Sequence, residues 1–226
     1  MCKKNNSLLG AVKKVEPYIS LIVSIASLAV AMTTALLAKT IGDEQIRAAK
    51  IQYAPIFTFR SDYEIENEIY KTEYLSIENE GYPILNFNPK LDTVITIRYT
   101  SYSPEIKTIT ISLPISYYLA KSGVSGGKGK LTMFIGDKNM GFAKNLGSEI
   151  SEFNKNNKNQ DIINYNIDTI VKISYVDASE EKKTKYYINQ LAVTESEYFA
   201  IYDKINGIPA LSRNDLTLEN LLKRIN

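Results

Sequence analysis

Hydrophobic and polar positions divide this chain into an apolar run near the N-terminus and a longer part in which they alternate. Residues 18–38, YISLIVSIASLAVAMTTALLA, contain no charged side chain. About 20 consecutive apolar residues suffice for a helix to cross the hydrocarbon core of a bilayer. We therefore predict a transmembrane helix at residues 18–38, preceded by a basic N-terminal flank at residues 1–17.

A cleaved signal peptide is the alternative interpretation of this run. Ala29-Val30-Ala31 has the small-residue pattern of a cleavage site. The apolar run continues through residues 32–38, however, and is longer than the core of an ordinary signal peptide. We therefore favour an uncleaved anchor.

The residues after the run favour a helix that continues the anchor. Residues 39–54 are rich in good helix formers, and Ile46, Ala49 and Tyr53 recur at helical spacing. Pro55 disfavours helical backbone at Ala54. We predict a juxtamembrane helical stalk at residues 39–54.

From Pro55 onwards the hydrophobic period changes to two, which is typical of strands with one buried face. Ile95, Ile97 and Tyr99 alternate in this way, and other pairs do the same. The predicted turns between strands are Asn79–Pro83, Asn88-Pro89, Ser103-Pro104 and Asp177–Glu180. We predict a soluble β-rich domain at residues 55–226, built as an antiparallel β-sandwich-like domain.

Three helical segments interrupt this strand pattern. An internal helix is indicated by Phe142, Leu146, Ile150 and Phe153. Two C-terminal helices begin with capping signals, Thr194 with Glu197 and Ser212 with Asp215. The predicted fold class is therefore mainly β with helical additions.

Small residues line one side of the predicted transmembrane helix, because their spacing follows the helical repeat. Small residues allow two helix backbones to approach closely in lipid. We therefore hypothesise that the helix self-associates in a homo-oligomer through a small-residue stripe made of Ser20, Ser24, Ser27, Ala31, Ala35 and Ala38. The alternative is that Ser and Ala are simply common in membrane helices.

The composition excludes several kinds of chemistry. The sequence has no histidine and one cysteine, Cys2. Ordinary zinc sites, Ser-His-Asp or Cys-His nucleophiles and intrachain disulfides are therefore excluded. We predict no catalytic residue, no cofactor and no metal site; an enzyme using carboxylates, Ser, Lys or Tyr is the less favoured alternative.

The excess positive charge lies before the anchor segment. Of 27 basic and 25 acidic residues, four lysines and Glu16 lie in residues 1–38, which leaves 23 basic and 24 acidic side chains in the rest. Nucleic acid is therefore an unlikely partner. The flanking lysines favour, by a narrow count, a soluble domain outside the cell.

The glycine-rich segment Gly123–Lys130 suggests a phosphate-binding loop but does not have its spacing. Where that motif requires glycine, lysine and a hydroxyl residue, this chain has Lys128, Gly129 and Lys130. We favour a flexible connector. In the alternative, Lys128 and Lys130 contact an anionic group.

Six tyrosines form another candidate surface. Tyrosine combines apolar area with a polar tip, which suits recognition, but packing at the edge of the core explains most of them better. They are Tyr117, Tyr118, Tyr186, Tyr187, Tyr198 and Tyr202.

The segment Leu75–Ile84 has the pattern L-x-I-x-N-x-G-x-x-I. Together with the lead-in Gln52–Pro55 and the hairpin around Ile173–Asp177, it resembles the immunoglobulin-like sandwiches of small prokaryotic single-pass membrane proteins with an N-terminal anchor. The resemblance implies an architecture and brings no catalytic residues with it.

These observations favour a single-pass, non-enzymatic binding protein of the cell membrane. Its expected partners are the lipid bilayer, further copies of itself and an unidentified protein. The alternative is a membrane-perturbing effector of a prokaryotic antiviral defence system, triggered by a cytosolic partner.

Overall fold

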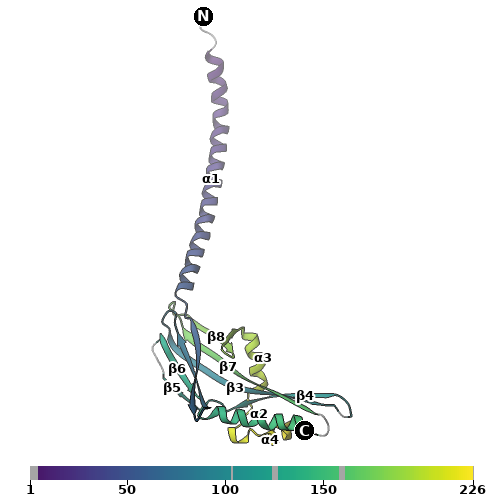
Figure 1. Ribbon diagram of the computed structural model, residues 1–226. Helices are drawn as coiled ribbons and strands as arrows, with labels where there is room; N and C mark the ends of the chain where they lie inside the picture. The colour runs from purple at the N-terminus through teal and green to yellow at the C-terminus, as the bar shows by residue number, and fades with distance from the viewer. Residues whose placement is uncertain (1–4, 103, 124–126, 158–160, 226) are drawn as a thin grey trace. The chain divides into compact units, whose positions relative to one another are not determined.

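The computed structural model describes residues 5–102, 104–123, 127–157 and 161–225, without the side chains of residues 5–17 and 50. The chain divides into two units, with the boundary between Gln52 and Tyr53. The first unit is helical and the second is rich in β-strands (Figure 1).

The N-terminal unit is one continuous helix, α1 (Asn5–Gln52). Its segment Tyr18–Ala49 is the one helical stretch of the described residues that is long and apolar enough to cross a membrane, and its most apolar part is exposed in the structure. The predicted membrane helix and its helical continuation are therefore a single element. A membrane anchor and a signal sequence both have these properties.

Four hydroxyl groups within α1 are satisfied by the helix itself. Ser24 and Thr34 donate hydrogen bonds to the carbonyls of Ser20 and Val30, and Thr33 and Thr40 do the same four residues back. A hydroxyl bonded in this way needs no water, so these residues are compatible with the bilayer core.

The C-terminal unit is built on two antiparallel sheets. The first sheet has the order β1 (Phe57–Glu66), β2 (Ile69–Asn79), β6 (Gly129–Ile135) and β5 (Ala120–Ser122). The second has the order β4 (Lys107–Ile115), β3 (Leu85–Ser101), β7 (Ile162–Val176), β8 (Lys182–Ile188) and β9 (Leu191–Val193). The predicted mainly β fold with helical additions is confirmed.

The two sheets pack face to face through alternate residues of their strands. Leu75 and Ile77 of β2 and Leu131 of β6 lie in one buried cluster with Val171 and Ile173 of β7. Because side chains of a strand alternate between its faces, the period of two in the sequence becomes one apolar layer between the sheets.

Helices cover both faces of the second sheet beyond this layer (Figure 1). One buried cluster joins β3 and β4 to α2 (Asn139–Asn156) and α4 (Leu218–Ile225). On the opposite face, Tyr198 and Ile205 of α3 (Glu195–Ile205) pack against Val94 and Ile170.

Two local predictions differ from the structure. Asn88-Pro89 does not form a turn, because it lies within β3 opposite Ser174 and Ile173, beside an irregularity in the strand register. Ser212 accepts a hydrogen bond from the Asp215 N–H, but it caps only a single 3₁₀ turn, η1 (Arg213–Asp215), and α4 begins at Leu218. The Thr194–Glu197 capping box of α3 is confirmed.

Candidate functional site

A cleft of about 230 Å³ lies between the two sheets. β2 and β7 line it from opposite sides, the segment after β4 contributes two aromatic rings, and the turn between β8 and β9 forms part of its rim. Its lining residues are Glu73, Leu75, Tyr117, Tyr118, Ile167, Thr169, Asn189 and Gln190.

Glu73 brings a carboxylate to the inward-facing side of β2. In this strand Glu73 shares its face with Leu75 and Ile77, both buried between the sheets. A charged residue on this inward-facing side of the strand is costly to bury unless polar groups form hydrogen bonds with it. The cleft provides those groups.

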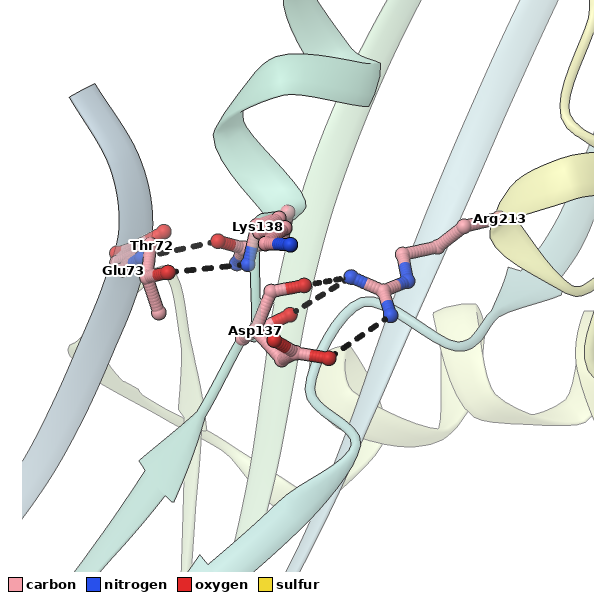
Figure 2. Close-up of polar contacts among 7 residues, drawn as sticks. Thr72, Glu73, Asp137, Lys138 and Arg213 are labelled. Atoms are coloured by element: carbon pink, nitrogen blue, oxygen red, sulfur yellow. Dashed lines mark hydrogen bonds and ion pairs between the residues drawn. The ribbon is translucent and has the colours of Figure 1, made fainter. Parts of the chain in front are cut away.

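The main chain of Glu73 is held by the first residue of α2 and the loop that precedes it. Its N–H donates to the Asn139 side-chain oxygen at 2.9 Å, and its carbonyl accepts from the Gly136 N–H at 2.9 Å. The neighbouring Thr72 hydroxyl accepts from the Lys138 N–H at 3.0 Å, as Figure 2 shows. These bonds fix the point from which the Glu73 side chain projects.

Arg213 fastens the same loop from its other side (Figure 2). Its guanidinium donates to the carbonyls of Gly136 and Asp137 and pairs with the Asp137 carboxylate at 3.4 Å. Asp137 and Lys138 both have left-handed backbone, with φ of 45° and 65°. This conformation is unfavourable for residues other than glycine, so the surrounding bonds hold the loop in place.

The Glu73 carboxylate accepts two side-chain hydrogen bonds. The Ser61 hydroxyl donates to Oε1 at 3.0 Å and the Tyr117 hydroxyl to Oε2 at 3.1 Å. Gln190 donates in turn to the Ser61 hydroxyl at 3.1 Å. This chain of polar contacts crosses from one sheet to the other.

Tyr117 and Tyr118 form the aromatic wall of the cleft. Their ring centroids are 5.0 Å apart in an edge-to-face arrangement, and Tyr117 also packs edge-to-face on Phe142 at 5.7 Å. Burial raises the pKa of both hydroxyls, and the Glu73 carboxylate raises each pKa further. Both tyrosines are therefore protonated donors at neutral pH.

The turn at the rim of the cleft has an unusual backbone. Asn189 and Gln190 connect β8 to β9 with φ of 49° and 71°. Two positive φ values define the tight turn that suits a two-residue hairpin, where Asn is common but Gln is not. The Asn189 side chain accepts from the Thr169 N–H at 2.9 Å and donates to Asp168 at 2.7 Å, which ties the turn to β7.

The carboxylate retains acceptor capacity towards the cleft. It has about four lone-pair positions; the Ser61 and Tyr117 hydroxyls occupy two of them, and the Tyr118 hydroxyl also approaches the carboxylate. Among the residues that the structure describes, no lysine or arginine forms an ion pair with Glu73. The arrangement can therefore accept a further donor, preferably a cationic one.

A second hollow, of about 470 Å³, runs along the exposed side of α2. Lys144, Gly147, Ser148, Ser151, Glu152, Lys155 and Asn156, which all belong to this one helix, line it. Because every described residue that lines it belongs to this single helix, we treat it as a shallow feature of the helix surface.

None of the predicted helix-association or anion-contact residues is among those that line this cleft. Ser20, Ser24, Ser27, Ala31, Ala35 and Ala38 are exposed on α1, and their role in association stays a prediction. Lys128 and Lys130 are exposed at the start of β6, where Lys130 lies opposite Glu78. Contact with an anionic group there also stays a prediction.

Among the six tyrosines, Tyr117 and Tyr118 line the cleft, whereas Tyr186, Tyr187, Tyr198 and Tyr202 pack in the apolar clusters. Glu73 was not among the residues predicted from the sequence. The sequence does contain a sign of it: Glu73 is a charged residue that alternates in step with Leu75 and Ile77, so it is expected on their buried face of the strand.

Among the described residues, no group of three or more Cys, Asp or Glu side chains is arranged to hold a metal ion. In comparisons with known proteins, no family model and no curated protein matches this sequence.

Proposed function

We propose that this protein is a single-pass, membrane-anchored binding protein whose β-rich domain takes a small cationic group, such as an alkylammonium, in the cleft at Glu73. The observation that carries the proposal is a carboxylate that faces an inter-sheet cleft, meets the hydroxyls of Ser61, Tyr117 and Tyr118, and forms no ion pair among the described residues. Charge-assisted hydrogen bonds to such a carboxylate are about twice as strong as neutral ones.

The walls of the cleft suit the same ligand. Aromatic rings attract cations within about 6 Å of their faces, and Tyr117 and Tyr118 border the carboxylate. A volume of about 230 Å³ is smaller than the usual range for drug-sized ligands. The cleft therefore fits one side-chain-sized group better than a whole cofactor.

The anchor supports the binding role by holding the protein at a bilayer. α1 continues well beyond the predicted span, to Gln52, without a break at the end of its apolar segment. We infer that the helix is retained as an anchor. A homo-oligomer and an unidentified protein partner remain parts of the proposal, and the membrane-perturbing effector stays the alternative.

The test uses the full-length protein in detergent with n-butylammonium as the probe and n-butyrate as its anionic counterpart. We expect saturable binding of n-butylammonium only, measured by calorimetric titration. Glu73→Gln should weaken binding roughly tenfold or more, because a hydrogen bond to a charged group contributes about 1.5–3 kcal/mol.

Glu152→Gln, on the exposed surface of α2, is the matched control and should bind as the wild type does. Equal affinity for butyrate, or unchanged affinity in Glu73→Gln, would contradict the proposal.

A further inference from the structure

Three of the four sheet edges in the described domain have features that discourage pairing with another strand. β5 and β9 contain three residues each. β1 carries Arg60, Asp62, Glu64 and Glu66 along its length. Short edge strands and charged side chains are two of the devices by which proteins avoid edge-to-edge association.

The fourth edge, β4, is longer and carries a charge or a proline only near its ends, at Lys107 and Pro114. Its segment Thr108–Leu113 reads T-I-T-I-S-L, with no charge and no proline. β-branched residues at alternate positions favour a strand, and an open strand of this kind is a template for a further strand. Only its C-terminal end is covered within the described residues, where Leu211 bonds to Pro114 and Ser116.

The bonds of Leu211 also show which backbone groups point outward. The Pro114 carbonyl and the Ser116 N–H both face away from β3. Because N–H and C=O groups of alternate residues face the same side of a strand, Thr108, Thr110 and Ser112 also direct their backbone groups outward. Pro114 fits this register, since an outward position needs no N–H for the sheet.

We propose that β4 pairs with β4 of a second copy of this chain, antiparallel and centred on Thr110. This register places Thr110 opposite Thr110, and Thr108 opposite Ser112 in both directions. The outward groups of these residues then form about six backbone hydrogen bonds. Moving the register by two residues in either direction leaves one of the three outward residues without an equivalent partner within the segment.

The side chains match in the same register. Ile109 and Ile111, both half-buried against the cluster of β3, α2 and α4, lie opposite each other and extend that apolar layer across the two copies. On the other face, hydroxyl pairs already join β3 to β4 within one copy, Thr96–Ser112 at 3.1 Å and Thr100–Thr108 at 3.3 Å. Between the copies, Thr108 of one lies opposite Ser112 of the other and continues this row of hydroxyl groups. Cross-strand pairs of these kinds stabilise sheets.

A second copy is the occupant that fits best because the segment is complementary to itself. A two-fold interface needs the same patch on both partners, and a strand that reads alike from its centre in both directions meets that condition. Two anchored copies in one membrane also meet at raised effective concentration. The inference does not depend on the ligand cleft.

Cross-linking in full-length protein tests the register. In a Cys2→Ser background, Thr110→Cys should form a disulfide-linked dimer under mild oxidation, since opposed residues of a hydrogen-bonded pair have Cα atoms about 5.5 Å apart. Leu191→Cys, exposed on the edge strand β9 of the same sheet, is the matched control and should stay monomeric on denaturing gels.

A second variant tests the energetics. Thr110→Pro removes an outward N–H that β3 does not use, so the domain should fold while the dimer dissociation constant in detergent rises roughly tenfold or more. Cross-linking of Thr110→Cys no greater than that of Leu191→Cys, or an unchanged dissociation constant in Thr110→Pro, overturns the proposal. Loss of ammonium binding in Glu73→Gln has no bearing on either result.

Discussion

The side-chain amide of Asn79 donates a hydrogen bond of 2.6 Å to the backbone carbonyl of Gly127, which lies 48 residues further along the chain. The same amide donates to the Tyr82 carbonyl, and its oxygen accepts from the N–H groups of Ile56 and Gly81. One fully buried side chain thus joins the start of the domain, the turn after β2 and the glycine-rich segment.

Asn79→Ala should therefore destabilise the domain strongly. It removes four hydrogen bonds: the Ile56 and Gly81 N–H groups and the Tyr82 carbonyl lose their partner, whereas the Gly127 carbonyl keeps the Ile84 N–H. Each polar group left unsatisfied on burial costs about 1–3 kcal/mol. We expect a loss of about 3 kcal/mol or more in the free energy of unfolding, measured by urea denaturation of the full-length protein. Asn164→Ala, at an exposed position of β7, should change it by less than about 0.5 kcal/mol.

The turn at Asn79 shows what local sequence can predict. Asn, Gly and Pro within five residues indicate a turn on their own chemistry, and the period of two and the Thr194 capping box are equally local. Asn88-Pro89 has similar chemistry but pairs with β7. Pairing with β7 overrides the local turn signal there, and the residues around Asn88 contain no information about that pairing.

The cleft depends on contacts between distant parts of the chain. Gln190 bonds to Ser61 from 129 residues away, and Glu73 meets Tyr117 from 44 residues away. The local pattern of hydrophobic and polar residues does not encode contacts between residues so far apart in the chain. The position of Glu73 on the inward-facing side of β2 could have marked it as unusual. The groups that form hydrogen bonds with its carboxylate, however, are brought to it only by the packing of the two sheets.

Tyr187 should make the stability of the domain fall in alkaline solution. Burial, followed by the neighbouring Tyr175, raises its pKa to about 12 in the folded state, against about 10 in the unfolded chain. The folded state therefore holds this proton more tightly. The contribution of protonated Tyr187 to the free energy of unfolding is fully present below about pH 10 and is lost as pH rises towards about 12.

Tyr187→Phe removes this dependence. Between pH 10 and 12, the free energy of unfolding of the wild type should fall more steeply than that of the variant, by up to about 1.4 kcal/mol per pH unit. Denaturant titrations at several pH values measure the two slopes. Parallel curves for the two proteins would contradict the assignment.

The small-residue stripe of α1 predicts a position-dependent effect on association. Ala31→Leu places a large side chain on the stripe, whereas Ala29→Leu places the same side chain about 180° away from its centre. If helices pack through the stripe, only the first change should weaken association of α1 in detergent or lipid, measured by energy transfer between labelled chains. Equal behaviour of the two variants would leave the stripe without a role.

The orientation in the membrane separates the binding protein from its effector alternative. The lysines before residue 18 favour a domain outside the cell, so protease added to right-side-out vesicles should remove the domain that begins at Tyr53. Inside-out vesicles are the control and should protect it. The reverse pattern would place the domain in the cytosol and favour the effector triggered by a cytosolic partner.

Whether substitution of Gly147 by alanine stabilises or destabilises the domain should depend on Tyr165. A Cβ at position 147 would lie 2.8 Å from the Tyr165 hydroxyl oxygen but 3.9 Å from the next ring atom. Gly147→Ala gains helix propensity of about 1 kcal/mol, yet it forces Tyr165 to shift. We expect a net destabilisation in the wild type, measured by thermal and urea unfolding.

In a Tyr165→Phe background the obstructing oxygen is absent, and only an ordinary contact remains. Gly147→Ala should then stabilise the domain by about 0.5–1 kcal/mol, because alanine is the better helix former. The double-mutant cycle isolates the coupling between the two positions. The same sign in both backgrounds would mean that α2 does not pack this closely on β7, and that glycine at this position serves another purpose.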